Sequence, residues 1–142
     1  MFSFSKKTEY GLIALSYLST LDNDSLANVA EIAESSSIPR ELLAKILSEL
    51  VKAGLAISYS GPTGGFRLAK PAQQVSLAEI ISALETKSAI IHCVADSSCC
   101  DRTESCRIRT PMSKVKQKVD MIFEETTLKD IADGHSMKSN IA

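Results

Sequence analysis

The chain has 142 residues, of which 44% are hydrophobic and 23% are charged, and its formal net charge is −1. This composition is typical of a globular protein with one or at most two small domains, and it excludes collagen-like, low-complexity and membrane-spanning classes. The first residues show no apolar secretory stretch, so we expect a cytoplasmic protein without membrane contact. Because the net charge is close to zero, any contact with a nucleic acid must come from the local placement of cations.

Three short helices are predicted near the start of the chain, where apolar residues recur at spacings of three and four. The first covers about residues 5–19 and ends in a polar break at 22–25, which offers a cap for a second helix at 26–34. The third starts at Pro39, because proline is favoured at the first helical position, and it runs to Ala53 before a C-terminal glycine.

A hairpin and a further helix are predicted next. Two short strands, at residues 55–60 and 66–69, enclose a turn rich in glycine and proline. Ser76 and Glu79 have the spacing of a capping box, which predicts a helix that continues to about Leu84. Three helices followed by a hairpin are the elements of a winged helix-turn-helix, so we predict a mainly α fold of that type.

The cysteines and a long helix occupy the rest of the chain. Residues 86–108 show no helical or strand period and contain every cysteine. Thr110 and Pro111 resemble a cap followed by a first-turn proline and predict a helix through Glu125, and Thr127 starts a second capping-box pattern. We therefore divide the chain into a winged domain, a cysteine loop, a helical segment and a flexible tail, which cover residues 1–85, 86–109, 110–132 and 133–142.

The winged helix-turn-helix has a direct use in binding DNA. The major groove admits one helix, and the second helix of the pair contacts bases with its N-terminal residues. The helix that starts at Pro39 would be this reader, and the glycine-rich turn would let the hairpin approach the sugar–phosphate backbone. The candidate contacts are Ser37, Pro39, Arg40, Glu41, Ala44 and Lys45 around the reader helix, Tyr59, Ser60, Thr63, Gly64 and Arg67 in the hairpin, and Ser5, Lys6 and Lys7 at the start of the first helix.

Other functions for the same elements stay open at this point. Helices with a hairpin also occur in protein-docking modules, and the absence of net positive charge favours that alternative. Arg67 could equally be an ordinary exposed strand residue. The sequence contains no serine–histidine–aspartate set, paired-carboxylate cleft or phosphate-binding loop, so we expect neither an enzyme nor a small-molecule substrate.

The cysteines point to metal or redox chemistry rather than to structural disulfides. Their spacing lacks the close pairs of structural zinc sites, whereas an iron–sulfur cluster accepts irregular spacing in a loop that wraps around it. Neighbouring arginines favour the thiolate form, although they could simply be solvated. His92 would point away from such a site in an extended segment, and four incidental thiols are the alternative without function. The candidates are Cys93, Cys99, Cys100 and Cys106.

Between about Phe4 and Ile131 the chain carries the stretches KKTEYGLIAL, SIPRELLAKILSELVKAGL, SGPTGGFRLAK, VSLAEIISALE and TTLKDI, together with the cysteine loop. In combination they resemble a bacterial winged-helix family that includes the iron–sulfur assembly regulator IscR and the nitric-oxide sensor NsrR. The resemblance implies a homodimer, with the helix at 111–125 as the dimerisation helix, that binds a palindromic operator in double-stranded DNA. Relatives often carry arginine where this chain has Ser60, so an arginine in the minor groove is not expected from that position.

The resemblance also implies an iron–sulfur cluster, either 2Fe–2S or 4Fe–4S, and a set of ligands. The family spacing selects Cys93, Cys100 and Cys106, with Cys99 as the alternative to Cys100. IscR-like members place a histidine three residues after the last cysteine, where this chain has an arginine that cannot ligate iron. NsrR-like members use an acidic residue in the first helix of the partner subunit, and the matching residue is Glu9, which could also be a surface residue.

Together these features predict a transcription regulator, and more specifically a repressor, that senses iron–sulfur supply, redox state or nitric oxide. By the resemblance, its targets would be genes of iron–sulfur assembly. Cluster binding would change operator affinity through a coupling of about 1–3 kcal/mol. The alternatives are a cluster-free regulator that uses thiols or zinc on the same fold, since adjacent Cys99 and Cys100 leave a spare thiol, and a docking module without DNA binding.

Overall fold

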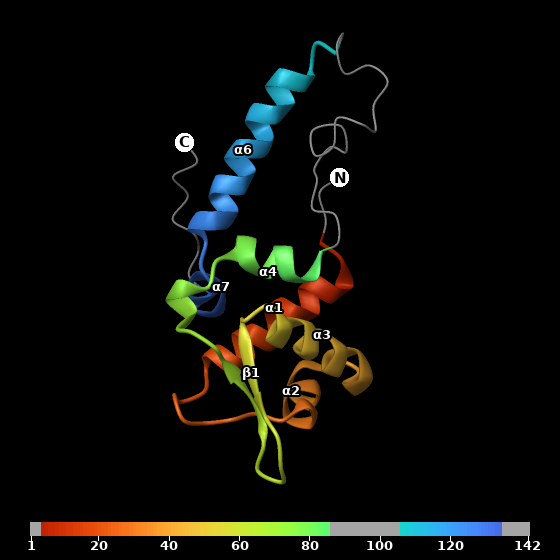
Figure 1. Cartoon of the computed structure of the whole chain (residues 1–142), viewed down its shortest axis with the longest axis vertical. Helices are drawn as coiled ribbons and strands as arrows, with labels where there is room; N and C mark the ends of the chain where they lie inside the picture. Colours follow the sequence, from red (N-terminus) through yellow and green to blue (C-terminus); the bar gives the residue numbers. More distant parts are fainter. Residues whose placement is uncertain (1–3, 86–105, 135–142) are drawn as a thin grey trace.

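The computed structural model describes residues 4–85 and 106–134. Within these residues the chain is mainly helical and has a single two-stranded sheet, which confirms the predicted fold class (Figure 1). His92, Cys93, Cys99 and Cys100 lie outside the described residues. The elements are α1 Lys6–Ser19, α2 Val29–Ser36, α3 Arg40–Lys52, β1 Ala56–Tyr59, β2 Gly65–Leu68, the 3-10 helix η1 Ala72–Gln74, α4 Leu77–Leu84, α6 Arg109–Glu125 and α7 Leu128–Ala132.

Side-chain caps determine where several helices start. Ser76 and Glu79 bond reciprocally to each other's backbone N–H groups at the start of α4, and Thr127 and Asp130 do the same at α7. Both predicted capping boxes are therefore confirmed. Ser5 caps α1 by accepting a hydrogen bond from a backbone N–H in the first turn.

The start of α2 differs from the prediction at residue 26. Ala27 pairs with Phe66 of β2 in an antiparallel bridge, with backbone N···O distances of 2.8 and 3.1 Å. Asn28 then caps the helix, which starts at Val29. The helix starts three residues later than predicted because a strand from a distant part of the sequence bonds to the backbone of Ala27.

Two other helix starts also differ from the sequence prediction. Pro39 is the cap residue of α3 rather than its first helical residue, with φ −58° and ψ 129°. The long helix α6 starts at Arg109 and is preceded by Ile108, so Thr110 lies inside the first turn and is not the cap. Proline still occupies the first turn of α6, where its missing N–H leaves no hydrogen bond unmade.

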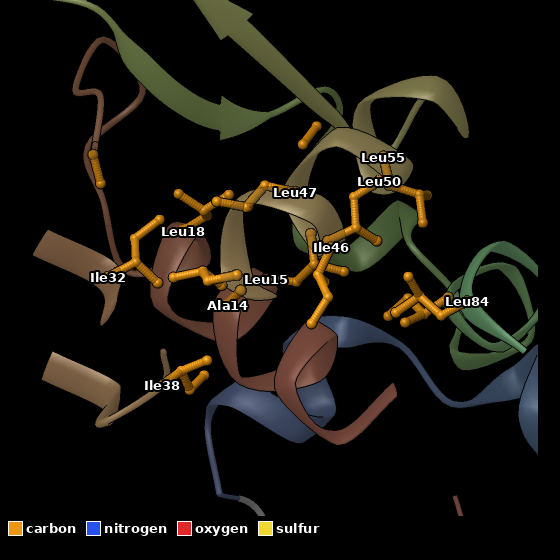
Figure 2. Packing of buried hydrophobic residues seen from close by; sticks show 14 of the residues in the cluster. Ala14, Leu15, Leu18, Ile32, Ile38, Ile46, Leu47, Leu50, Leu55 and Leu84 are labelled. Atoms are coloured by element: carbon orange, nitrogen blue, oxygen red, sulfur yellow. The ribbon is translucent and has the colours of Figure 1, made fainter. Parts of the chain in front are cut away.

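An aliphatic core joins α1, α3 and α4 (Figure 2). Leu15 of α1 and Leu47 of α3 are fully buried, and Leu84 at the end of α4 packs against the same cluster. Gly11 allows this packing, because a Cβ at that position would lie 2.2 Å from Leu84 Cδ1 and 3.5 Å from Ile46 Cγ2. The three helices therefore form one tightly fitted unit that supports the helix-turn-helix.

The short helix α7 belongs to the same unit. The segments that start α4 and α7 pair as an antiparallel bridge, in which Leu77 N–H donates to Thr126 O and Leu128 N–H donates to Val75 O, each at 2.8 Å. Leu128 is fully buried in the core. Although the sequence grouped α7 with the long helix, its packing is with α1 and η1.

Helix α6 is different, because none of its residues is buried. Figure 1 shows it extending away from the rest of the molecule. Its contacts with the body are at its C-terminal half, where the Phe123 ring lies 6.1 Å from that of Phe4. Exposed apolar side chains on it include Val115, Met121 and Ile122. Within the described residues, no helix is long and apolar enough to cross a membrane.

Candidate nucleic-acid interface

The reader helix α3 has two clearly different faces. Its apolar face is buried in the core through Leu43, Ile46, Leu47 and Leu50. The opposite face is exposed and carries four of the predicted DNA contacts. They are Arg40, Glu41, Ala44 and Lys45.

The turn before α3 is fixed by its backbone conformation and by one anchor. Ser37 ends α2 in the left-handed region, with φ 55° and ψ 37°, and its own N–H donates to Ala33 O. Ile38 follows and is buried, which fixes the turn to the core. Ser37 and Pro39 are exposed on either side of this anchor, as the DNA interpretation requires.

The wing is the β1–β2 hairpin, paired from Ala56 with Leu68 to Tyr59 with Gly65. Its tip places Ser60 and Thr63 in solvent, and Tyr59 is 42% exposed. Gly64 is required at the turn, because a Cβ there would lie 2.1 Å from the backbone oxygen of Tyr59. Figure 1 shows the hairpin projecting on the same side as α2, away from α6.

Arg67 does not project freely from the wing. Its guanidinium Nη1 donates to the backbone oxygen of Asn23 at 3.3 Å, and the group lies 5.1 Å from the centre of the Tyr59 ring. The side chain therefore joins the wing to the loop between α1 and α2. This contact orients Tyr59 as well, since the guanidinium lies over its ring.

The cations at the start of α1 are paired with acids. Lys6 Nζ lies 2.8 Å from Glu9 Oε2, and this hydrogen bond raises the pKa of Lys6. Lys7 Nζ lies 2.7 Å from Glu49 Oε2 and so connects α1 to the reader helix. Ser5 caps α1 and donates to Glu85, so the three residues predicted here as DNA contacts all have partners within the chain.

Two of the predicted cluster ligands lie within the described residues. Cys106 is half-buried and precedes α6, and Glu9 is 45% exposed on α1. They are in different elements, and among the described residues no three histidine, cysteine or acidic side chains form a group that could hold a metal ion.

A further exposed residue of the reader helix, Ser48, was not among the predicted DNA contacts. Ser48 lies one turn after Ala44 and Lys45 and is exposed on the same face of α3. Its spacing of four and three residues from them is the signal that could have identified it.

Comparison with known proteins identifies the family. A family model described as Rrf2, iron-dependent transcriptional regulator, matches residues 4–134. A protein of Aquifex aeolicus (strain VF5), described as an HTH-type transcriptional regulator, is 35% identical over 130 residues, which are 90% of each chain. The chain belongs to the Rrf2 family.

Solved structures share the fold of this Rrf2 protein. CymR, the global cysteine regulator of B. subtilis, matches with a TM-score of 0.79 at 23% identity, over 96% of this chain and 100% of that chain. IscR of T. potens matches with a TM-score of 0.74 at 23% identity, over 97% and 91%. The oxidized form of Staphylococcus aureus CymR matches with a TM-score of 0.72 at 26% identity, over 92% and 96%.

These findings confirm several expectations from the sequence. The Rrf2 family is one of DNA-binding transcriptional regulators, and the resemblance to the IscR-containing family is confirmed. The predicted winged helix fold agrees with the solved regulator structures. The relatives are described as regulators rather than enzymes, as the sequence also indicated.

Proposed function

We propose that this Rrf2 protein is a transcription repressor that binds a palindromic operator as a homodimer, under the control of an iron–sulfur cluster. The DNA-binding part of this proposal is supported by the reader helix, which has one buried apolar face and one exposed face. Its inner face is fixed in the core, while Arg40 and Lys45 on the outer face have no acidic partner among the described residues. A rigid helix with free cations at its N-terminal half suits insertion into the major groove.

The wing and the turn complete the proposed interface. Ser60, Thr63 and Tyr59 at the wing, with Gly64 between the strands, would contact the sugar–phosphate backbone beside the groove that α3 occupies. Ser37 and Pro39 would lie at the phosphates next to the first turn of α3. We assign Arg67, Lys7 and Ser5 to holding these elements in place, because each already has a partner within the chain. Lys6 remains a phosphate contact in this proposal, because its side chain is 76% exposed and its surface ion pair with Glu9 is easily exchanged for another partner.

The DNA-binding part is tested with a duplex selected from a random library. Loss of Arg40 is expected to weaken binding by about 1–3 kcal/mol if it contacts a base, and loss of Lys45 to lower the salt slope by about one if it contacts a phosphate. Lys118→Ala on α6, also an exposed lysine, is the matched control. Binding that does not depend on salt, or equal affinities of all three variants and the wild type, would contradict the proposal and favour a docking module.

The homodimer is supported by the exposed apolar residues of α6. Met112, Val115, Val119 and Ile122 recur at spacings of three and four along this helix, and none of its side chains is buried. Such a stripe is the pattern that packs against a second helix. A two-fold dimer would present two copies of α3 to the two halves of a palindrome.

The residues that would hold the cluster are Cys93, Cys100, Cys106 and Glu9 of the partner subunit, with Cys99 as the alternative to Cys100. The described members of this set fit the group chemically. Cys106 precedes the N-terminus of a 17-residue helix and is followed by Arg107 and Arg109, whose positive charges would partly offset the negative charge of a thiolate-held cluster. Glu9 is held only by a surface ion pair with Lys6, which is easily exchanged for another partner.

When bound, a cluster would supply a centre that responds to redox state, nitric oxide or iron–sulfur supply. The protein's own part is to couple that centre to α3. Glu9 lies on α1, and α1 is joined to the reader helix by the Lys7–Glu49 pair and by the core. A coupling of about 1–3 kcal/mol would change operator affinity by roughly 5–150-fold.

The cluster part is tested by anaerobic purification followed by an absorption spectrum and analysis of iron and sulfide. We expect a coloured wild type, a bleached Cys100→Ala variant and a coloured Cys99→Ala variant. The reverse pattern for the two variants would assign Cys99 instead. A colourless, iron-free wild type after reconstitution would contradict the cluster while leaving the DNA-binding proposal to its own test.

A cluster-free thiol or zinc regulator is the second candidate. It is supported by the adjacent Cys99 and Cys100 and by the similarity at 26% identity to the structure described as an oxidized form of CymR. Zinc content and disulfide state, measured on the same anaerobic preparation, distinguish it from the cluster proposal.

A further inference from the structure

A single carboxylate joins the end of α4 to the start of α1. Glu85 follows the last residue of α4, and its Oε1 accepts a hydrogen bond from Ser5 N–H at 2.9 Å. The same oxygen accepts one from Ser5 Oγ at 2.8 Å and one from Thr8 Oγ1 at 2.6 Å. We call these three residues the Glu85 clamp.

The Glu85 clamp differs from an ordinary surface contact because one of its three residues is buried. Thr8 is 0% exposed, and it is the one polar residue that is buried among those the structure describes. The hydrogen bond from Thr8, followed by those from Ser5, lowers the pKa of Glu85, so the carboxylate is ionised at neutral pH. Its charge also lies at the positive end of the α1 dipole, which adds to the attraction.

The part of α1 that the Glu85 clamp holds also contacts the reader helix. One residue before Thr8, Lys7 reaches Glu49 on α3 at 2.7 Å. One turn further along α1, the backbone at Gly11 lies so close to α4 that a Cβ there would clash with Leu84. The same Cβ would lie 3.5 Å from Ile46 Cγ2 of α3. The start of α1 is therefore held between the end of α4 and one side of α3.

We propose that Glu85 is a positioning residue for DNA binding, whose carboxylate holds the start of α1 so that Lys7 and Glu49 keep α3 in its binding position. This inference rests on the DNA-binding function proposed above. Base readout requires a recognition element to be held within about 0.5 Å and 10–20° of its productive position. Loss of the Glu85 clamp frees the first turn of α1 and with it the charged contact to α3.

The chain offers a matched control for this role. Glu79 is also a carboxylate on α4, it bonds to the backbone N–H of Ser76, and Lys70 Nζ lies 2.6 Å from it. Those hydrogen bonds, first the one from Lys70, lower the pKa of Glu79 as well. Within the described residues, the Glu79 carboxylate makes no hydrogen bond or ion pair to α1 or α3, so its loss perturbs a helix cap without perturbing the reader helix.

The experiment measures the dissociation constant for the selected duplex with the full chain, alongside the melting temperature. Glu85→Ala is expected to weaken DNA binding on the order of tenfold, whereas Glu79→Ala changes it by less than about twofold. Glu85→Gln, which keeps a side-chain oxygen as acceptor, restores part of the affinity. Thr8→Ser retains near wild-type binding and Thr8→Val resembles Glu85→Ala.

A double-mutant cycle separates positioning from general stability. If Glu85 acts through Lys7 and Glu49, the effects of Glu85→Ala and Glu49→Gln on the dissociation constant are not additive. Additive effects, or equal losses for Glu85→Ala and Glu79→Ala that follow the melting temperature, would overturn the proposal.

A third readout does not require DNA. If the wild type binds no selected duplex, the proposed function fails, and the Glu85 clamp is then assessed by the backbone amide resonances of Arg40–Lys52. Glu85→Ala is expected to shift them and Glu79→Ala to leave them in place. Unchanged resonances in both variants would overturn the positioning role.

Discussion

The body of the molecule, meaning the helices that share the core, and helix α6 differ in how they treat their apolar side chains. In the body, α1, α3, α4 and α7 bury their apolar side chains in one common core. In α6 no residue is buried, and Val115, Met121 and Ile122 remain 44–56% exposed. Since most helices in proteins are stabilised mainly by packing of an apolar face, the exposed stripe of α6 is a surface on which a partner could pack. The comparison shows that the body buries its apolar side chains within the described residues, whereas α6 keeps an exposed apolar stripe, which is the basis of the dimer proposed above.

The largest loss of stability is expected from a substitution that creates a cavity in the core. Leu47→Ala removes a fully buried side chain from the face of α3 that meets α1, and we expect a loss of about 2–5 kcal/mol in the free energy of unfolding. The measurement is urea unfolding followed by circular dichroism. Ser48→Ala, its exposed neighbour, should change stability by less than about 0.5 kcal/mol. A loss below about 1 kcal/mol for Leu47→Ala would mean that the body is not the main folding unit.

A smaller effect is expected where the body leaves no space for one methyl group. A Cβ on Gly65 would lie 2.7 Å from the backbone oxygen of Ala27, so Gly65→Ala has to displace the bridge to β2. We expect a destabilisation of about 1–3 kcal/mol by the same unfolding measurement. Ser58→Ala, on the exposed side of β1, is the control. A fully stable Gly65→Ala variant would show that this bridge shifts without cost.

In α6 the expected loss concerns assembly rather than folding. Ile122→Asp places a charge in the apolar stripe, and we expect self-association to weaken at least about tenfold, or about 1.4 kcal/mol, measured by sedimentation velocity. The circular dichroism spectrum of the body should be unchanged. Gln117→Asp, on the opposite side of the helix, should leave association intact. A dimer that survives Ile122→Asp would remove α6 as the interface.

The smallest effect is expected from acid. Because hydrogen bonds from Thr8 and then Ser5 hold the pKa of Glu85 below the ordinary 4.5, its ionised form stabilises the fold above that pH. This contribution is lost as the pH falls through the lowered folded pKa. The melting temperatures of wild type and Glu85→Gln should therefore differ at pH 7, on the order of 1–3 °C, and converge as the pH falls through the lowered folded pKa of Glu85. A difference that persists unchanged at low pH would show that the charge of Glu85 is not what matters.

The parts of the fold that depend on neighbouring residues could be predicted from the sequence. The Ser76 and Thr127 capping boxes, the glycine after α3 and the wing turn are all short patterns with a local physical cause. The exposed face of α3 followed from helical spacing for the same reason.

The remaining errors come from contacts between distant residues. The start of α2 moved because Ala27 pairs with β2, some 39 residues later. Lys7 and Arg67 stay predicted DNA contacts, but the sequence did not show their partners within the chain, because Glu49 and Asn23 lie 42 and 44 residues away from them. No spacing rule encodes such pairs, since only the packed fold brings them together.

The antiparallel bridge between the segments that start α4 and α7 has a consequence for any shortened version of this protein. A fragment ending at residue 85 would contain the reader helix and the wing, yet it would lack Leu128, which fills the core from the far end of the chain. The fragment would have a hole in place of that leucine and a backbone N–H and carbonyl at residues 75–77 open to water. The winged domain therefore does not form a complete core by itself. It also requires α7, which follows the cysteine segment and α6 in the chain.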